Sequence, residues 1–192
     1  MEMAGGMTRG SLYEAHADDW FAVRVNSNCE RRTVTALTGK GYESFVPLCW
    51  QYRNWSNRIR KVERAMIPGY VFSRFNPEDR LPILTIPGVT YIVGTSAGPL
   101  PVDPDELAAL RRIAESSALA EPWPFLSAGQ VVKLASGPLR GLCGRLVSTS
   151  RDTKVVVSVT LLQRSVAVEV ERSWIRPADE TQVFLEAVSA ST

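Results

Sequence analysis

Five short runs of apolar, mostly β-branched residues near the carboxyl end constrain the fold of this chain most strongly. They lie at residues 131–135, 142–147, 154–161, 166–170 and 174–175. Each run is shorter than an ordinary helix, and the breaks between runs contain turn residues such as Gly137 and Pro138. Short strands at this spacing are typical of a small β-barrel, which we predict over residues 127–178.

The stretch "GQVVKLASGPLRGLCGRL", residues 129–146, gives the glycines of this region separate roles. Gly137 and Pro138 predict a turn, because glycine permits positive φ and proline fixes φ. Gly141 belongs to the same loop. Gly144 lies inside a strand pattern, which predicts a β-bulge or the close approach of another backbone.

Residues 19–115 predict an α+β domain with an antiparallel sheet and flanking helices. Strands are expected at residues 20–25, 42–50, 68–75 and 89–93. A Ser27/Glu30 capping box predicts a helix from about Asn28, and residues 76–79 should open a short second helix. Asp103 should cap a third helix that ends near Glu115. Its apolar residues Leu107, Leu110 and Ile113 are at helical spacing.

The remaining segments predict the domain boundaries. Residues 1–18 and 179–192 are interpreted as tails. Residues 116–126 contain two prolines and no periodicity, so they are interpreted as a linker between residues 19–115 and 127–178.

Charge is unevenly distributed along the chain. Residues 20–75 carry ten basic and three acidic side chains, and residues 127–177 carry eight and three, although the net charge is only +2. Two basic blocks favour two modules that each meet a polyanion. A solvated basic surface is the simpler alternative for either block.

The residues argue against an enzyme. The one histidine, His16, lies in a predicted tail, and no phosphate-binding loop or nucleophile motif is present. Cys29, Cys49 and Cys143 are far apart, so no disulfide framework and no zinc site is predicted. We expect no cofactor, no metal and no membrane segment, and a cytoplasmic location.

Four segments, "WFAVRVNSNCERR", "IPGYVFSRF", "IPGVTYIVG" and "DPDELAALRRI", occur in the order and at the spacing of the N-terminal NGN domain of NusG transcription elongation factors. The stretch at 129–146, with "KVVVSVTLLQRSVAVEVERSWIRP", resembles their KOW domain. The resemblance covers about residues 19–178. It implies an NGN-type sheet with flanking helices, a small SH3-like KOW β-barrel, and a bacterial elongation or antitermination factor.

Two segments differ from the usual NusG sequence and indicate a subclass of the family. The basic segment "QYRNWSNRIRKVERAMIPGYVF" is similar to the UpxY-type antiterminators, which act on long polysaccharide operons. Where NusG has Ile-Phe-Gly-Arg, this chain has Leu161-Leu162-Gln163-Arg164, and the lost aromatic argues against binding to Rho and to a small-subunit ribosomal protein. A housekeeping NusG and a KOW-containing RNA- or ribosome-binding protein remain the alternatives.

The resemblance implies two sites on the first domain. The clamp helices of the largest RNA polymerase subunit would meet an apolar surface, which we name the polymerase-binding set: Ile67, Pro68, Gly69, Tyr70, Phe72 and Tyr91. The non-template DNA strand would meet a second group, which we name the DNA-facing set: Arg24, Asn28, Arg31, Arg32, Trp55, Arg58, Arg60 and Lys61. The alternatives are that the apolar residues are ordinary core and that the basic residues are merely solvated.

A third site belongs to the KOW module, where the resemblance implies partner docking. Its residues, which we name the docking set, are Gly137, Pro138, Gly141, Gly144, Leu161, Leu162 and Arg164, with Lys133, Arg140 and Arg145 nearby in sequence. Some relatives store this domain as a helical hairpin. Here the β-branched runs 155–159 and 166–170 predict a stable barrel, and the chain is expected to be a monomer.

Overall fold

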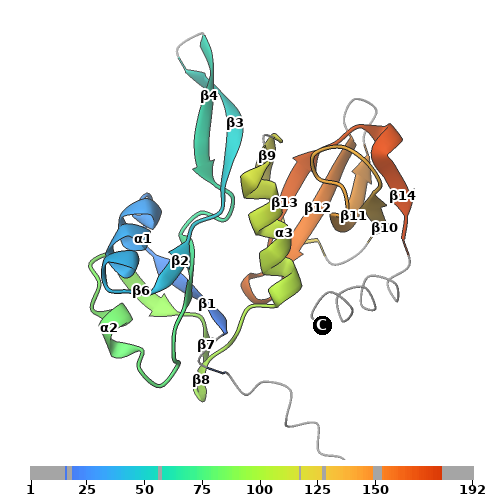
Figure 1. The fold of residues 1–192 in the computed structure, drawn as a ribbon. Helices are drawn as coiled ribbons and strands as arrows, with labels where there is room; N and C mark the ends of the chain where they lie inside the picture. Colours follow the sequence, from blue (N-terminus) through green and yellow to red (C-terminus); the bar gives the residue numbers. More distant parts are fainter. Residues whose placement is uncertain are drawn as a thin grey trace, which may run out of the picture.

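The computed structural model describes residue 16 and residues 19–55, 58–116, 118–126, 129–148 and 153–178. Of residues 53–55 and 148 only the backbone is described. The tails predicted at 1–18 and 179–192 lie outside the described residues, except for residue 16. Figure 1 shows two sheets with helix α3 between them and a long hairpin that projects beyond both.

The first sheet is antiparallel, with strand order β2-β5-β1-β6. Its strands are β1 (Trp20–Val25), β2 (Glu43–Phe45), β5 (Tyr70–Arg74) and β6 (Val89–Ile92). Helices α1 (Glu30–Gly39) and α2 (Leu81–Leu84) lie along the chain between these strands. Alternate strand residues such as Phe21, Val23 and Val71 point to one face, where they form a core with Leu37 of α1 and Ile83 of α2.

The second sheet has the order β14-β10-β11-β12-β13-β9, and its paired neighbours are antiparallel. Its strands are β9 (Ala120–Trp123), β10 (Val131–Leu134), β11 (Cys143–Ser148), β12 (Thr153–Val159), β13 (Arg164–Glu169) and β14 (Ile175–Pro177). Short 3-10 turns occupy η1 (Thr160–Leu162) and η2 (Arg172–Trp174). The expectation of an α+β fold with a β-rich C-terminal part is confirmed.

Two smaller hairpins complete the fold. β3 (Leu48–Trp55) pairs with β4 (Arg58–Ala65) along their full length. β7 (Gly94–Thr95) pairs with β8 (Gly98–Pro99). The strand expected at residues 42–50 is therefore two strands, β2 and β3. The basic segment that follows is not an irregular excursion but the body of the β3–β4 hairpin.

Gly144 and Gly137 in the second sheet have the close packing and the turn geometry that the sequence predicted for them. A Cβ on Gly144 would lie 2.6 Å from Val155 Cγ1 and 2.7 Å from the carbonyl oxygen of Val156, so only glycine permits this close pairing of β11 with β12. Gly137 has a φ of +80°, and a Cβ there would lie 2.6 Å from the Trp174 ring.

Two local expectations differ from the structure. Ala120–Trp123, expected to be linker, forms β9 and pairs with β13, because an edge strand needs only backbone groups and tolerates Pro122. The Ser27/Glu30 capping box is wrong. Helix α1 begins at Glu30 with Cys29 as N-cap and no capping side chain. The Glu30 carboxylate instead accepts a hydrogen bond from the backbone of Gly69.

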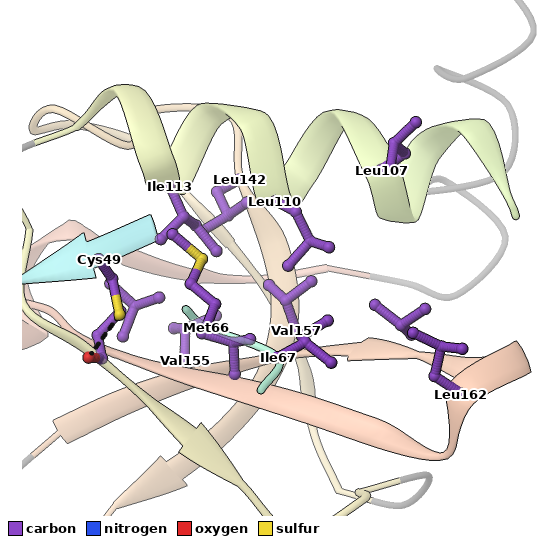
Figure 2. Close-up of a cluster of buried hydrophobic side chains, with 14 of the residues drawn as sticks. Cys49, Met66, Ile67, Leu107, Leu110, Ile113, Leu142, Val155, Val157 and Leu162 are labelled. Carbon is purple, nitrogen blue, oxygen red and sulfur yellow. Dashed lines mark hydrogen bonds between the residues drawn. The ribbon is translucent and has the colours of Figure 1, made fainter. Parts of the chain in front are cut away.

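Helix α3 (Pro104–Glu115) has the predicted bounds and cap. Asp103 Oδ1 accepts hydrogen bonds from the backbone N–H groups of Asp105 at 2.8 Å and Glu106 at 3.1 Å. The apolar stripe Leu107, Leu110 and Ile113 is buried. Figure 2 shows it lying over Val155, Val157 and Leu142 of the second sheet and its loops.

The second core therefore spans both sheets. Met66 and Ile67, on the connection from β4 to β5, reach into the layer beneath α3, as Figure 2 shows. Tyr70 and Phe72 of the first sheet belong to the same buried cluster. Among the described residues, none of the helices is long and apolar enough to cross a membrane.

Candidate functional site

Three side chains form a row across the first sheet. Arg24 on β1 is paired directly with Tyr70 on β5 and with Tyr91 on β6. Directly opposed residues in a sheet share one face, so the three lie side by side. The Arg24 guanidinium carbon is 4.8 Å from the centroid of the Tyr70 ring. The row therefore joins the predicted polymerase-binding set to the predicted DNA-facing set at Arg24.

The turn at residues 67–70 is held from two sides. Gly69 has a φ of +82°, and a Cβ there would collide with the Arg24 guanidinium. The Gly69 N–H donates to Glu30 Oε1 at 2.8 Å, and Arg24 Nη1 lies 3.4 Å from the Pro68 carbonyl oxygen. The positive φ favours glycine in this turn, and a Cβ would also require the end of the Arg24 side chain to shift.

The polymerase-binding set divides by exposure. Ile67, Tyr70 and Phe72 are buried in this arrangement, whereas Pro68 is exposed and Tyr91 is 48% exposed. Ile67 is 1% exposed because it lies beneath α3 and against the second sheet. A partner that approaches this arrangement from solvent meets Pro68 and Tyr91, and reaches the others only if α3 and the second sheet move away.

Arg111 of helix α3 packs on aromatic side chains of the first sheet. Its guanidinium carbon lies 4.4 Å from the centroid of the Trp20 ring and 4.5 Å from that of Phe45. Its Nη2 is 3.7 Å from Glu43 Oε1. Helix α3 therefore presents its apolar stripe to the second sheet and this arginine to the first.

The DNA-facing set falls into two groups. Asn28, Arg31 and Arg32 are exposed at the start of α1, and Asn28 has a φ of 63°. Arg58, Arg60 and Lys61 are exposed on β4. An ion pair between Arg31 and Glu63 connects the groups. The side chain of Trp55 lies outside the described residues.

The docking set of the second sheet lies partly against α3. Leu162 is buried, Leu161 is half-buried, and Pro138, Arg140 and Arg164 are exposed. A Cβ on Gly141 would lie 3.2 Å from Arg112 Nη1 of α3. Arg145 Nη1 donates to the carbonyl oxygen of Gly129 at 3.0 Å, and Lys133 is half-buried.

Glu106 connects α3 to the turn that begins the 161–164 segment. Its carboxylate accepts hydrogen bonds from the Thr160 backbone N–H at 3.0–3.1 Å and from the Thr160 hydroxyl at 2.6 Å. Burial raises the pKa of Glu106 above its ordinary value, the bonds from Thr160 oppose this shift, and the charge of Asp103 adds to it.

Sequence reasoning missed Glu30, Arg111 and Glu106. Glu30 was assigned to a cap, and the other two gave no signal, because their partners lie far away in sequence. Within the described ranges, no cluster of three or more His, Cys, Asp or Glu side chains could hold a metal ion. Cys49 is buried with its Sγ 3.1 Å from the Ala120 carbonyl oxygen, and burial raises the pKa of this thiol.

Comparison with known proteins identifies the family. A family model described as transcription termination factor NusG matches residues 18–111. The transcription termination/antitermination protein NusG of Deinococcus radiodurans is 30% identical over 131 residues, 59% of this chain and 69% of that protein. The protein of the same name from Vibrio cholerae is 28% identical over 182 residues, 88% of this chain and 100% of that protein.

A solved structure agrees on the fold. The structure described as "Domain interaction in Thermotoga maritima NusG" superposes with a TM-score of 0.51 at 19% identity, covering 84% of this chain and 98% of that one. The chain belongs to the NusG family of transcription termination/antitermination factors, which are not enzymes.

Proposed function

We propose that this protein is a cytoplasmic transcription elongation factor that binds bacterial RNA polymerase through its first sheet and suppresses pausing or termination. The observation that carries the proposal is the row Tyr70–Arg24–Tyr91 beside the rigid turn at Gly69. Glu30 and Arg24 hold the turn, and of the residues beside it Pro68 and Tyr91 are exposed to a partner helix in this arrangement.

The clamp helices of the largest polymerase subunit are the proposed occupant of this surface. Pro68 and Tyr91 would form the first contacts, since they are exposed. Engagement of Ile67, Tyr70 and Phe72 would follow once α3 and the second sheet separate from the first sheet. Polymerase would then stabilise the separated arrangement by the difference between its affinities for the two states.

The second sheet is proposed to dock a partner through the turn at residues 161–164 and the loop at 137–144. Glu106 holds the start of this turn by its bonds to Thr160, so access to the turn would also follow separation from α3. The family resemblance supports a small-subunit ribosomal protein as the partner, although the loss of the aromatic residue at Leu162, which is buried, weakens the case for it as it does for Rho. Rho is not proposed, because a factor that opposes termination does not recruit it.

The specialised role is proposed from the basic hairpin. Residues 48–65 carry five basic side chains and one acidic one. A basic hairpin beside α1 would hold the phosphates of the non-template strand in the transcription bubble. Recruitment of this kind suits an antiterminator that serves particular long operons, such as those for polysaccharide synthesis.

Single-round transcription with purified bacterial RNA polymerase tests the proposal. The template carries a pause site and a Rho-dependent terminator, and Rho is added to half of the reactions. We expect shorter pauses and more read-through with the protein than without it. Increased Rho-dependent termination would instead indicate a housekeeping NusG. An unchanged pattern together with binding to free RNA would favour a KOW-containing RNA-binding protein.

A further inference from the structure

The β3–β4 hairpin and the second sheet begin to pair with each other and then stop. Trp50 of β3 forms a parallel bridge with Leu119, just before β9. Among the described residues this is the one bridge between the hairpin and the second sheet, and β3–β4 remains a separate sheet. A cleft of about 360 Å³ lies beside the bridge, between β3 and β9. The open space therefore begins where the pairing ends.

The cleft is lined by strand edges. Its lining contains three successive residues of β3, 50–52, and four successive residues at the start of β9, 119–122. Ala167 and Glu169 of β13 complete the described lining. Side chains alternate between the two faces of a strand, so successive residues line one space where that space borders the edge of the strand. The cleft therefore lies along the edges of β3 and β9 rather than over one face of the hairpin.

The register shows which backbone groups of β3 point toward the cleft. The Met66 N–H donates to the Pro47 carbonyl oxygen at 2.8 Å, in the residue pair that precedes β3 and β4. Hydrogen-bonded and non-hydrogen-bonded pairs alternate along an antiparallel ladder. Counting from Pro47, Trp50 and Tyr52 take non-hydrogen-bonded positions. The N–H and C=O of Tyr52 therefore point away from β4, on the side where Trp50 meets the second sheet.

Pro122 explains why the pairing stops. On β9, the Leu119 carbonyl oxygen accepts a hydrogen bond from the Glu169 N–H of β13 at 3.2 Å. By the same alternation, the backbone groups of residues 120 and 122 point toward β3. A continued parallel ladder would need the N–H of residue 122 to donate to the Tyr52 carbonyl oxygen, and proline has no N–H.

The edge of β3 at Tyr52 is consequently open. The other bond of a continued ladder would join its N–H to the Ala120 carbonyl oxygen, which instead accepts from Cys49 Sγ at 3.1 Å, as Figure 2 shows. No described backbone group bonds the backbone of Tyr52 on this side. An unpaired strand edge is a template for another extended chain. The cleft therefore fits an extended peptide segment that pairs with Tyr52 as an added strand.

The carboxylates of the cleft select the charge of that segment. Glu121 and Glu169 belong to the lining, and no basic residue is among the described lining residues. The ammonium of Lys154 pairs with Glu121 at 2.5 Å. No described side chain forms an ion pair with Glu169, which is exposed. One carboxylate at the cleft is therefore open to a cation from a ligand.

The aromatic rings favour the same kind of ligand. The Lys61 ammonium lies 4.9 Å from the centroid of the Trp50 ring, so one ring of this face already contacts a cation. Tyr52 is 60% exposed, and no described cation lies over its ring. Three arginines of β4 lie on the opposite face of the hairpin: Arg58, Arg60 and Arg64. An exposed ring near an open carboxylate suits the side chain of an arginine or lysine.

We propose that the cleft between β3 and β9 binds an extended, basic segment of a partner protein. The segment adds a strand to the edge of β3 at Tyr52 and places an arginine or lysine side chain between the Tyr52 ring and Glu169. The chain's own residues 179–192 carry three acidic and no basic side chains, so their charge opposes binding here. The site goes beyond the proposed function, which assigns no ligand to this cleft.

Fluorescence anisotropy with the full-length protein and labelled heptapeptides tests the proposal. The probe is "VRVRVRV", whose arginines share one face when the peptide is extended. One control is "VEVEVEV", and the other is "VRVRVRV" with every backbone nitrogen methylated, which keeps the cations but cannot donate from its backbone. We expect only the unmethylated arginine peptide to bind. Equal binding of the methylated peptide would mean that charge alone acts, and tighter binding of "VEVEVEV" would indicate an acidic occupant. Either result overturns the proposal.

Side-chain variants locate the bound peptide. Tyr52→Ala should weaken binding by about two- to thirtyfold, the range of a cation–ring contact, and Tyr52→Phe should bind like the wild type. Glu169→Gln should weaken binding by about two- to fivefold. Glu115→Gln removes an exposed carboxylate on α3 and should leave binding unchanged. Circular dichroism checks that each variant is folded.

Pro122→Ala tests the strand edge itself. This change supplies the missing N–H, so β9 competes with the peptide for the Tyr52 carbonyl oxygen and binding should weaken. Hydrogen exchange of the free variant should show a protected amide at position 122. Wild-type affinity in Pro122→Ala, or in both Tyr52→Ala and Glu169→Gln, overturns the proposal. So does a wild-type protein that fails to bind "VRVRVRV".

Discussion

The negative charge of Glu106 is unfavourable in the partly buried position that its side chain occupies. Its carboxylate satisfies the backbone and hydroxyl of Thr160, but burial raises its pKa above the ordinary value. The folded state therefore binds the proton more tightly than the unfolded state does. By linkage, the free energy of unfolding falls as pH rises through the folded-state pKa of this group.

Replacement of Glu106 by glutamine should remove this contribution. Glutamine is neutral and still offers an oxygen to Thr160, so at pH 7 the Glu106→Gln variant should be at least as stable as the wild type. Its stability should change less between pH 7 and pH 4.5. Urea unfolding across this range measures the difference, with Glu115→Gln, exposed at the other end of α3, as control. Identical pH profiles for Glu106→Gln and wild type would refute the assignment.

Gly144 and Glu30 show which contacts of a single residue can be predicted from sequence and which cannot. A glycine inside a strand pattern predicted either a β-bulge or a close backbone approach at Gly144, and the structure shows the close approach. Glu30 was misread, because a carboxylate three residues after a serine satisfies a capping pattern without regard to distant partners. Its true partner, the N–H of Gly69, lies 39 residues away.

Helix α3 is the element whose bounds were predicted and whose packing was not. Its cap, length and apolar stripe follow from local sequence. Periodicity gives the buried side of a helix but not the surface that it meets. The stripe packs on the second sheet rather than on the sheet of its own predicted domain. The same limit applies to β9, whose pairing with β13 required the tertiary structure.

The cap of α3 gives a prediction at the element scale. Asp103→Ala removes the acceptor for two N–H groups of the first turn and should lower the free energy of unfolding by about 1 kcal/mol. Asp105→Ala lacks this role and should cost only a few tenths of a kcal/mol through the helix dipole. Urea denaturation compares the two variants. Equal losses would mean that charge, not capping, stabilises this end of the helix.

At the scale of the whole molecule, the shared core couples the two sheets. Met66 and Ile67 from the first half and Val155 and Val157 from the second belong to one buried cluster with Leu110. The two-domain prediction gave no signal of this, because an apolar position reveals burial but not its partner. The division into domains at residues 19–115 and 127–178 remains a prediction about folding units.

Leu110→Ala tests the coupling. This side chain is 0% exposed, so its loss should cost about 2–5 kcal/mol. Native-state hydrogen exchange should show faster opening for amides of both β5 and β12, because each sheet loses packing beneath α3. Leu81→Ala, on the exposed side of α2, is the matched control. Faster exchange in β12 alone would show that the sheets open independently.

The most direct measurement is co-elution of the full-length protein with bacterial core RNA polymerase in size-exclusion chromatography. The wild type and Leu81→Ala should co-elute with polymerase, and Tyr91→Ala should lose much of the complex, since Tyr91 is the exposed end of the row. If all three proteins co-elute, polymerase binding is supported, but the proposed binding site at Tyr91 is rejected. If the folded wild type does not co-elute, the account of this protein as a polymerase-bound factor is contradicted.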